Sequence, residues 1–217
     1  MESVISERMK FTKEENAQFW EAAQAHSDEE WVTNDTLQRI CRLHSVTSMI
    51  YEAPTPLNVL EIGVGLGAAT KDLHKLNHIV TAVDISPTAL SRVVSFCKAT
   101  YLTPAMIDIP NDSIDFALCS NVFIHCDDAM VRFISEQVAR ILRKGGRFIC
   151  DTGNIQHPIP EPNRDRSISR GTHNYRTPDR LIQLVCESDL SFVSSDNEYY
   201  STAEGELDAY YVDFIKN

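Results

Sequence analysis

The chain lacks the sequence features that mark several large protein classes. No apolar run approaches the roughly 18 residues needed to cross a bilayer, and the N-terminal stretch MESVISERMKF has no apolar signal core. The six cysteines form no CxxC or CxxxC pair of the kind found in metal ribbons and redox motifs. These absences predict a cytoplasmic protein whose cysteines are buried, reduced thiols.

Positive charge is also scarce. The net charge is −11 and no basic stripe is interleaved with aromatic residues, so we expect the surface to repel nucleic acid. One local exception is the segment 164–180, which holds five arginines against two aspartates. His157 and His173 lie in the same region. No further histidine or carboxylate cluster with ligand spacing accompanies them, so no metal site is predicted.

Short apolar runs alternate with helical patterns in the larger part of the chain. Strands are predicted at 58–62, 78–84, about 103–107, 114–120 and 146–152, and helices at 67–76, 87–99, 127–142 and 177–188. Two further alternating segments, 190–200 and 207–216, predict an antiparallel pair. This order predicts an α/β fold with a doubly wound, mostly parallel seven-stranded sheet of the Rossmann-like kind. Before it, 14–26 and 35–52 are predicted helices.

Three alternating glycines follow the first predicted strand, in LEIGVGLGAATKDL at 60–73. Gly63, Gly65 and Gly67 lack a Cβ atom, so the turn can adopt unusual φ angles and a ligand can lie directly against backbone amides. Gly63, Gly65 and Ala68 also satisfy the dinucleotide fingerprint GxGxxA. The loop therefore indicates a nucleoside-type cofactor but does not specify which one.

Two carboxylates flank this loop. Asp84 ends the second predicted strand, where it can bind both ribose hydroxyls, although it could also cap the helix that opens at Pro87. Glu61 lies two residues before the first glycine and is predicted to present a negative charge to the mouth of the loop. That charge would disfavour a pyrophosphate and suit the cationic amino and sulfonium groups of S-adenosylmethionine.

Five successive motifs strengthen this interpretation: LEIGVGLG, VTAVDIS, MIDIP, IDFALCSNVFIHC and RILRKGGRFI. In order and spacing they resemble class I S-adenosylmethionine-dependent methyltransferases of the small-molecule type, over roughly residues 57–152. The resemblance implies an S-adenosyl-L-methionine-binding methyltransferase domain at 54–217, with a helical lid or extension at 1–53. A long connection at 153–176 would then be the substrate loop.

The resemblance also implies roles for individual residues in cofactor binding. The methionine portion would face Glu61, Gly63, Gly65 and Gly67, and its amino group would lie near the carbonyl of Ser120. The ribose would bind Asp84. The adenine would contact Ile85, Asp108 and Ile109. Asp108 would read the exocyclic amine of adenine, although it could instead form the turn before Pro110. Ile85 and Ile109 could equally be plain core residues.

Methyl transfer from a sulfonium is an in-line displacement, so the protein chiefly supplies alignment and desolvation. A base is needed only where the acceptor must lose a proton. His125, just past the fourth predicted strand, is the candidate for a base or a substrate hydrogen bond, with a purely positional role as the alternative. Asp127 and Asp128 are predicted to begin the following helix.

The acceptor site is predicted from charge and aromatic residues. Arg170 and Arg176 can offer forked donors to a carboxylate, phosphate or phosphonate, with the hydroxyl of Tyr175 between them, unless this loop is simply solvated. Trp20 and Trp31 in the N-terminal region could close over the acceptor, or could pack on the core.

The leading prediction is therefore methyl transfer from S-adenosylmethionine to oxygen or nitrogen of a small molecule, including anionic ones. An NAD(P)-dependent oxidoreductase remains an alternative because of the dinucleotide fingerprint and Asp84. A non-catalytic, cofactor-binding regulatory subunit is a second alternative. The acceptor's identity, the number of methyl groups transferred and the oligomeric state stay open at this point.

Overall fold

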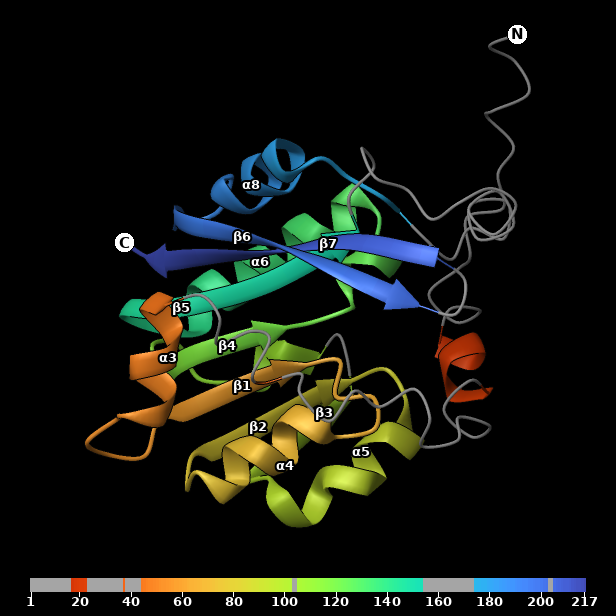
Figure 1. Cartoon of the computed structure of the whole chain (residues 1–217). Helices are drawn as coiled ribbons and strands as arrows, with labels where there is room; N and C mark the ends of the chain where they lie inside the picture. The colour runs from red at the N-terminus through yellow and green to blue at the C-terminus, as the bar shows by residue number, and fades with distance from the viewer. Residues whose placement is uncertain (1–16, 23–36, 38–43, 103–104, 154–173, 203–204) are drawn as a thin grey trace, which may run out of the picture.

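A seven-stranded sheet forms the centre of the computed structural model, which describes residues 17–22, 37, 44–102, 105–153, 174–202 and 205–217 (Figure 1). The strands are β1 Asn58–Ile62, β2 Ile79–Asp84, β3 Ala99–Leu102, β4 Ile114–Cys119, β5 Leu142–Gly153, β6 Leu190–Thr202 and β7 Gly205–Lys216. Their spatial order is β3-β2-β1-β4-β5-β7-β6. The first five run parallel, whereas β7 pairs antiparallel with both β5 and β6. The predicted fold class is confirmed.

Helices cover both faces of this sheet. They are α3 His44–Tyr51, α4 Ala68–Lys75, α5 Pro87–Val93, α6 Asp128–Ile141 and α8 Pro178–Cys186, with 3₁₀ turns η2 Val94–Phe96, η3 Ala105–Asp108 and η4 Phe123–His125. Ile50 of α3 and Leu73 of α4 pack with Val59 on one face. Val138 of α6 and Leu184 of α8 pack with neighbouring Leu60 on the other. Since successive strand residues point to opposite faces, β1 is covered on both sides, as its nearly continuous apolar sequence predicts.

The predicted third strand is displaced. β3 occupies Ala99–Leu102, and the segment predicted as strand, about 103–107, instead enters the 3₁₀ turn η3. Met106 and Ile109 are both buried, and their spacing of three residues brings them to the same side of a helical turn. The helix predicted at 87–99 is also shorter, because α5 ends at Val93 and leaves room for β3.

The predicted antiparallel pair at 190–200 and 207–216 is confirmed as β6 and β7. An ion pair between Arg147 of β5 and the fully buried Asp213 of β7 fastens this pair to the parallel part of the sheet. In the N-terminal region residues 17–22 are helical and α3 lies within the second predicted helix. The rest of both predicted helices and most of the loop at 153–176 lie outside the described residues. No helix in the described part is long and apolar enough to span a membrane.

β1 and β4 are neighbours at the centre of the sheet. After β1 the chain continues to β2 on one side, and after β4 it continues to β5 on the other side. The loops that follow β1 and β4 therefore meet at the carboxyl edge of the sheet, where open α/β folds bind their ligands. They meet closely: a Cβ atom on Gly63 would lie 2.2 Å from Val122 Cγ2.

Gly67 tests how tightly this edge is built. It has φ +79°, and a Cβ atom there would lie 2.4 Å from Val93 Cγ1 of α5, whose side chain is buried. We expect Gly67→Ala to lower the free energy of unfolding by about 2–4 kcal/mol, from backbone strain and overlap together. The matched control is Gly145→Ala, because Gly145 has φ +77° but nothing within 4 Å of the added atom.

The control should cost only the backbone term of about 1–2 kcal/mol. Urea denaturation of both variants measures the difference. Equal losses of unfolding free energy in the two variants would show that the Val93 side chain can shift without an energetic cost and that the packing around the loop is loose.

Candidate functional site

The glycine turn after β1 has the backbone geometry that the sequence predicts. Gly63, Gly65 and Gly67 have φ angles of 76°, 52° and 79°, all in the left-handed region that favours glycine. The turn is closed by two backbone hydrogen bonds, from Gly63 N to Val83 O at 2.7 Å and from Gly67 N to Val64 O at 2.8 Å. It is thereby bound to the end of β2, beside Asp84.

Asp84 joins the glycine turn to α5. Its carboxylate accepts hydrogen bonds from Ser86 N at 2.8 Å and Gly65 N at 3.3 Å. The side chain that caps α5 is Ser86, whose Oγ accepts from Ala89 N. Ser86, and not Asp84, is therefore the helix cap, and the carboxylate of Asp84 lies against the glycine turn. Burial raises its pKa, and the hydrogen bonds from Ser86 and Gly65 oppose that rise.

Glu61 differs from the expectation in its charge. It is 5% exposed, on the face of β1 covered by α4, where the hydroxyl of Thr70 donates to its carboxyl group. Burial raises the pKa of Glu61 to about 8, the Thr70 hydrogen bond opposes this, and the charge of Asp84 adds to it. The carboxyl group is thus mostly protonated at neutral pH. The predicted negative charge at the mouth of the loop is absent until something stabilises the ionised form.

The three residues predicted to contact adenine follow β2 and β3. Ile85 is half-buried after β2, while Asp108 ends η3 with an exposed side chain. Ile109 is only 3% exposed and belongs to the core cluster on the α6 face, where Met106 also lies. The adenine assignments remain predictions, and among them Ile109 has the surroundings of a core residue.

Sequence reasoning missed Asp151, which organises the end of β4. This buried residue near the end of β5 accepts hydrogen bonds from Ser120 Oγ at 2.9 Å and Asn121 N at 2.6 Å. Asn121 has φ +57°, so the chain turns sharply just after the predicted cofactor residue Ser120. The available signal was a lone carboxylate at the end of a predicted central strand, where parallel strands bring polar groups to one edge.

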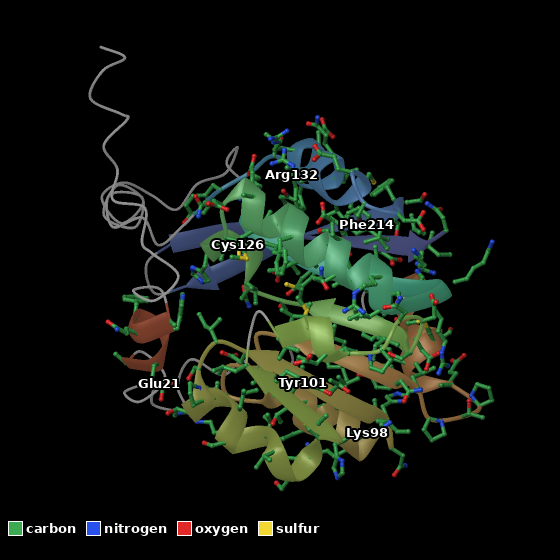
Figure 2. All side chains as sticks on the ribbon, turned by 180° about the vertical axis from the view of Figure 1, so that it is seen from behind. Glu21, Lys98, Tyr101, Cys126, Arg132 and Phe214 are labelled. Atoms are coloured by element: carbon green, nitrogen blue, oxygen red, sulfur yellow. The ribbon has the colours of Figure 1, made fainter. Side chains whose placement is uncertain are left out.

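The helical segment 17–22 lies across this edge and contacts both halves of it. The rings of Trp20 and His125 have centroids 4.4 Å apart. The carboxylate of Glu21, labelled in Figure 2, accepts hydrogen bonds from the hydroxyls of Ser86 and Thr88 at the start of α5. Trp20 is thus brought against the predicted catalytic residue, while Trp31 lies outside the described residues. No pattern in the sequence pointed to Glu21.

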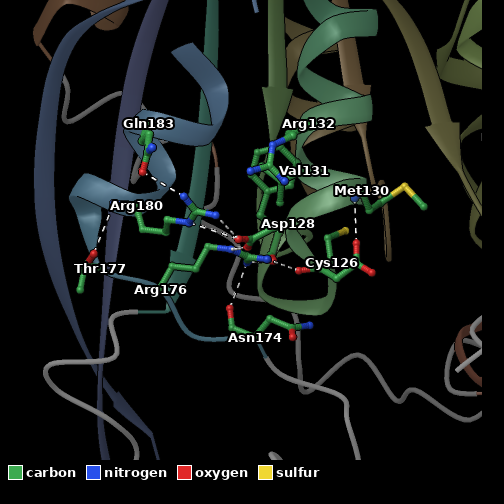
Figure 3. Close-up of polar contacts among 12 residues, drawn as sticks. Cys126, Asp128, Met130, Val131, Arg132, Asn174, Arg176, Thr177, Arg180 and Gln183 are labelled. Atoms are coloured by element: carbon green, nitrogen blue, oxygen red, sulfur yellow. Dashed lines mark hydrogen bonds and ion pairs between the residues drawn. The ribbon is translucent and has the colours of Figure 1, made fainter. Parts of the chain in front are cut away.

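Arg176 is paired with groups of the protein itself. Its side chain is 5% exposed, and Nε donates to Asp128 Oδ1 at 2.8 Å while Nη1 donates to Phe123 O at 2.9 Å. Arg180 donates to the other carboxylate oxygen of Asp128, at 2.6 Å from Nη2 (Figure 3). The guanidinium of Arg176 therefore ties the strand-to-helix connection after β4 to the start of α8. Its predicted role as a ligand for an anionic acceptor finds no support in these contacts.

A cavity of about 300 Å³ opens beside this network. It is lined by Asp127, Asp128, Asn174, Tyr175 and Arg176. Asp127 caps α6 by accepting from Met130 N at 2.8 Å, as predicted. Tyr175 and Arg176 of the predicted acceptor set both line this cavity, whereas Arg170 lies outside the described residues. Within the described part of the chain, no group of three or more His, Cys, Asp or Glu side chains could hold a metal ion.

Comparison with known proteins agrees with this geometry. Residues 60–150 match the family model described as a methyltransferase domain, which spans β1 to β5 and every predicted cofactor residue. A demethylmenaquinone methyltransferase of Tropheryma whipplei (strain Twist) is 31% identical over 106 residues. That alignment covers 46% of this chain and 42% of the relative.

Solved structures share the fold at low sequence identity. The N-methyltransferase NodS from Bradyrhizobium japonicum WM9, in complex with S-adenosylhomocysteine, has a TM-score of 0.64 at 20% identity, over 92% of this chain and 97% of its own. The [4+2]-cyclase SpnF has a TM-score of 0.60 at 12% identity, over 81% and 80%. These solved structures share the fold expected for a class I methyltransferase, and the family model matches its central part, while the cyclase shows that the fold alone does not fix the reaction.

The buried Glu61 makes stability depend on pH. In the unfolded chain its proton is lost near pH 4.5, whereas the folded protein retains the proton up to about pH 8. Between these values the folded state binds more protons, so the free energy of unfolding falls as pH rises, by at most about 1.4 kcal/mol per unit. We expect Glu61→Gln to remove this slope and to be more stable than the wild type at pH 8. Urea denaturation from pH 5 to 8.5 checks it, and parallel curves for the two proteins would contradict it.

Proposed function

We propose that this chain, whose residues 60–150 match the methyltransferase-domain family model, transfers the methyl group of S-adenosylmethionine to a small molecule. The observation that carries the proposal is the pair of buried carboxyl groups, Glu61 and Asp84, beside a turn with three left-handed glycines. Such a turn admits a ligand to within contact of the backbone, and the carboxyl groups define its charge.

The protonation of Glu61 supports a cationic ligand. A bound sulfonium or ammonium group would stabilise the ionised carboxyl group and displace its proton, recovering part of the cost of burying it. A diphosphate would instead hold the proton in place. Affinity for S-adenosylmethionine should therefore rise with pH between about 6.5 and 8.5. Asp84, already aligned by two backbone amides, is suited to the ribose hydroxyls.

Bound S-adenosylmethionine would supply the electrophilic methyl group, and the residues of this chain would align the acceptor and exclude water. His125 follows β4 on the same edge as the glycine turn, in the position to accept a proton or a hydrogen bond from the acceptor. Trp20 lies against its ring and would shield it from water. The Ser120–Asn121 turn, fixed by Asp151, would direct backbone groups toward the amino end of the cofactor.

The acceptor we propose is a small molecule methylated on oxygen or nitrogen. The cavity of about 300 Å³ next to η4 has the volume for such a ligand, and Asn174 and Tyr175 contribute polar groups to it. With Arg176 paired to Asp128, an anionic acceptor would depend on Arg170 and its neighbours in 164–170. NodS, similar in fold, is an N-methyltransferase, which keeps nitrogen among the acceptor atoms.

Binding of the cofactor distinguishes this proposal from an NAD(P)-dependent oxidoreductase. S-adenosylhomocysteine at 100 times its dissociation constant should add about 2.7 kcal/mol to the free energy of unfolding, and NADH should add nothing. Asp84→Ala should weaken binding at least about tenfold, because two hydrogen bonds to the ribose are lost. Asp72→Ala is the control, since Asp72 pairs only with exposed Lys75 on α4 among the described contacts.

Calorimetry measures these affinities. Unchanged binding by Asp84→Ala, or stabilisation by NADH alone, would contradict the proposal. Cofactor binding without release of S-adenosylhomocysteine on any metabolite pool would favour the regulatory alternative.

His125→Ala tests the proposed base. Turnover should fall by about 10²-fold or more for an acceptor that must lose a proton, such as a hydroxyl, and change little for one already ionised, such as a carboxylate. The pH–rate profile of the wild type should lose its acidic limb in the variant. Trp20→Leu provides the comparison, because it keeps the base but removes its aromatic cover. A wild-type profile that is flat from pH 5.5 to 8.5 would show that no base operates.

A further inference from the structure

The side chain of Arg140 joins the last turn of α6 to the segment that carries Asp108. Nη2 donates to Met106 O at 2.7 Å, and Nη1 donates to Ile109 O at 2.8 Å and to Asn111 Oδ1 at 2.6 Å. One guanidinium thus binds the backbone on both sides of Asp108. Arg140 opens the motif RILRKGGRFI, and its hydrogen bonds within the described part of the chain involve none of the residues assigned above to the acceptor.

This segment needs an external support. η3 is a single 3₁₀ turn, so the carbonyl groups at its end have few partners of their own. Within the segment, Ile109 N donates to Met106 O at 3.0 Å, and the planar guanidinium adds donors to both carbonyls at once. Met106 and Ile109 are buried while Asp108 is exposed, so fixing the two buried residues fixes the direction of the third.

The main chain of α6 reinforces the same attachment. Ser113 N donates to Ile141 O at 2.9 Å and Asp112 N to Arg140 O at 3.3 Å. The end of α6 therefore holds the segment from 106 to 113 by side chain and backbone together. Removing the guanidinium would leave the backbone bonds at 112 and 113 in place and release the part that contains Asp108.

We infer that Arg140 is a positioning residue that sets the selectivity for adenine by fixing the carboxylate of Asp108. The inference depends on the proposed function and on the role that the methyltransferase resemblance implies for Asp108, which is to accept a hydrogen bond from the exocyclic amine of adenine. A fixed carboxylate disfavours a base that carries a carbonyl oxygen in place of the exocyclic amine, because two hydrogen-bond acceptors would then face each other. A carboxylate free to turn away loses the bond to adenine and also tolerates the oxygen.

The experiment compares the dissociation constants of S-adenosylhomocysteine and S-inosylhomocysteine by calorimetry. The wild type should prefer the adenine compound by about tenfold or more. Arg140→Lys, which keeps the charge but loses the fork, should reduce this preference about fivefold or more. Asp108→Ala should abolish it, and the double variant should lose nothing further, since both changes act on one contact.

Arg143→Lys is the matched control. Arg143 lies three residues further on and binds Asp112 O at 3.2 Å and Asp115 Oδ1 at 2.6 Å, without contacting Met106 or Ile109. The Arg143→Lys variant should prefer the adenine compound by the same factor as the wild type. If Arg140→Lys fails to fold, Asn111→Ala takes its place: it removes one partner of the guanidinium at an exposed position and should lower the preference by a smaller factor.

The outcomes separate the two levels of inference. An unchanged preference in folded Arg140→Lys, with Asp108→Ala abolishing it, would overturn the positioning role and leave the proposed function standing. A preference unaffected by Asp108→Ala would overturn both the positioning role and the adenine assignment. Absence of binding by S-adenosylhomocysteine in the wild type would overturn the proposed function itself.

Discussion

Burial of the Glu61 and Asp84 carboxyl groups beside the glycine turn constrains the elements around the site. Each group needs donors that replace water, and these come from different helices: Thr70 from α4, and Ser86 at the start of α5. The turn at 63–67 supplies another and must come close to do so, which only left-handed glycines allow. The positions of β1, β2, α4 and α5 are thus coupled to the charge of one small region.

Where local pattern and tertiary position agree, the sequence predicted this structure well. β1, β2 and β4 are central strands covered on both faces, and their continuous apolar runs match them within one residue. The caps of α5, α6 and α8 are local in the chain, with Asp127 and Thr177 accepting from backbone amides three residues on. The glycine turn was recognisable for the same reason, because its φ angles require a residue type that the sequence displays.

The errors occurred where the deciding partner is distant in the chain. β3 is a short, half-buried strand beyond α5. The segment after it contains the buried i, i+3 pair Met106 and Ile109, whose apolar residues resemble those of a strand. The pairing of Arg176 with Asp128 was not visible in the sequence, because the two residues are 48 positions apart. Asp151 and Arg140 act on the loops after β4 and β3 across about 30 residues, as the separations of 30 and 34 in their bonds show. Charge counting and periodicity contain no information about such pairs.

The position of β7 has a consequence for how the chain folds. β7 follows β6 in the chain yet lies between β5 and β6, and β6 pairs with no other described strand. During synthesis, the backbone groups of β6 stay without their strand partner until the residues of β7 have left the ribosome. The parallel half can assemble earlier, so this edge is completed last. Until then β5 offers a bare strand edge to other chains, which is the interval in which nascent copies are most exposed to aggregation.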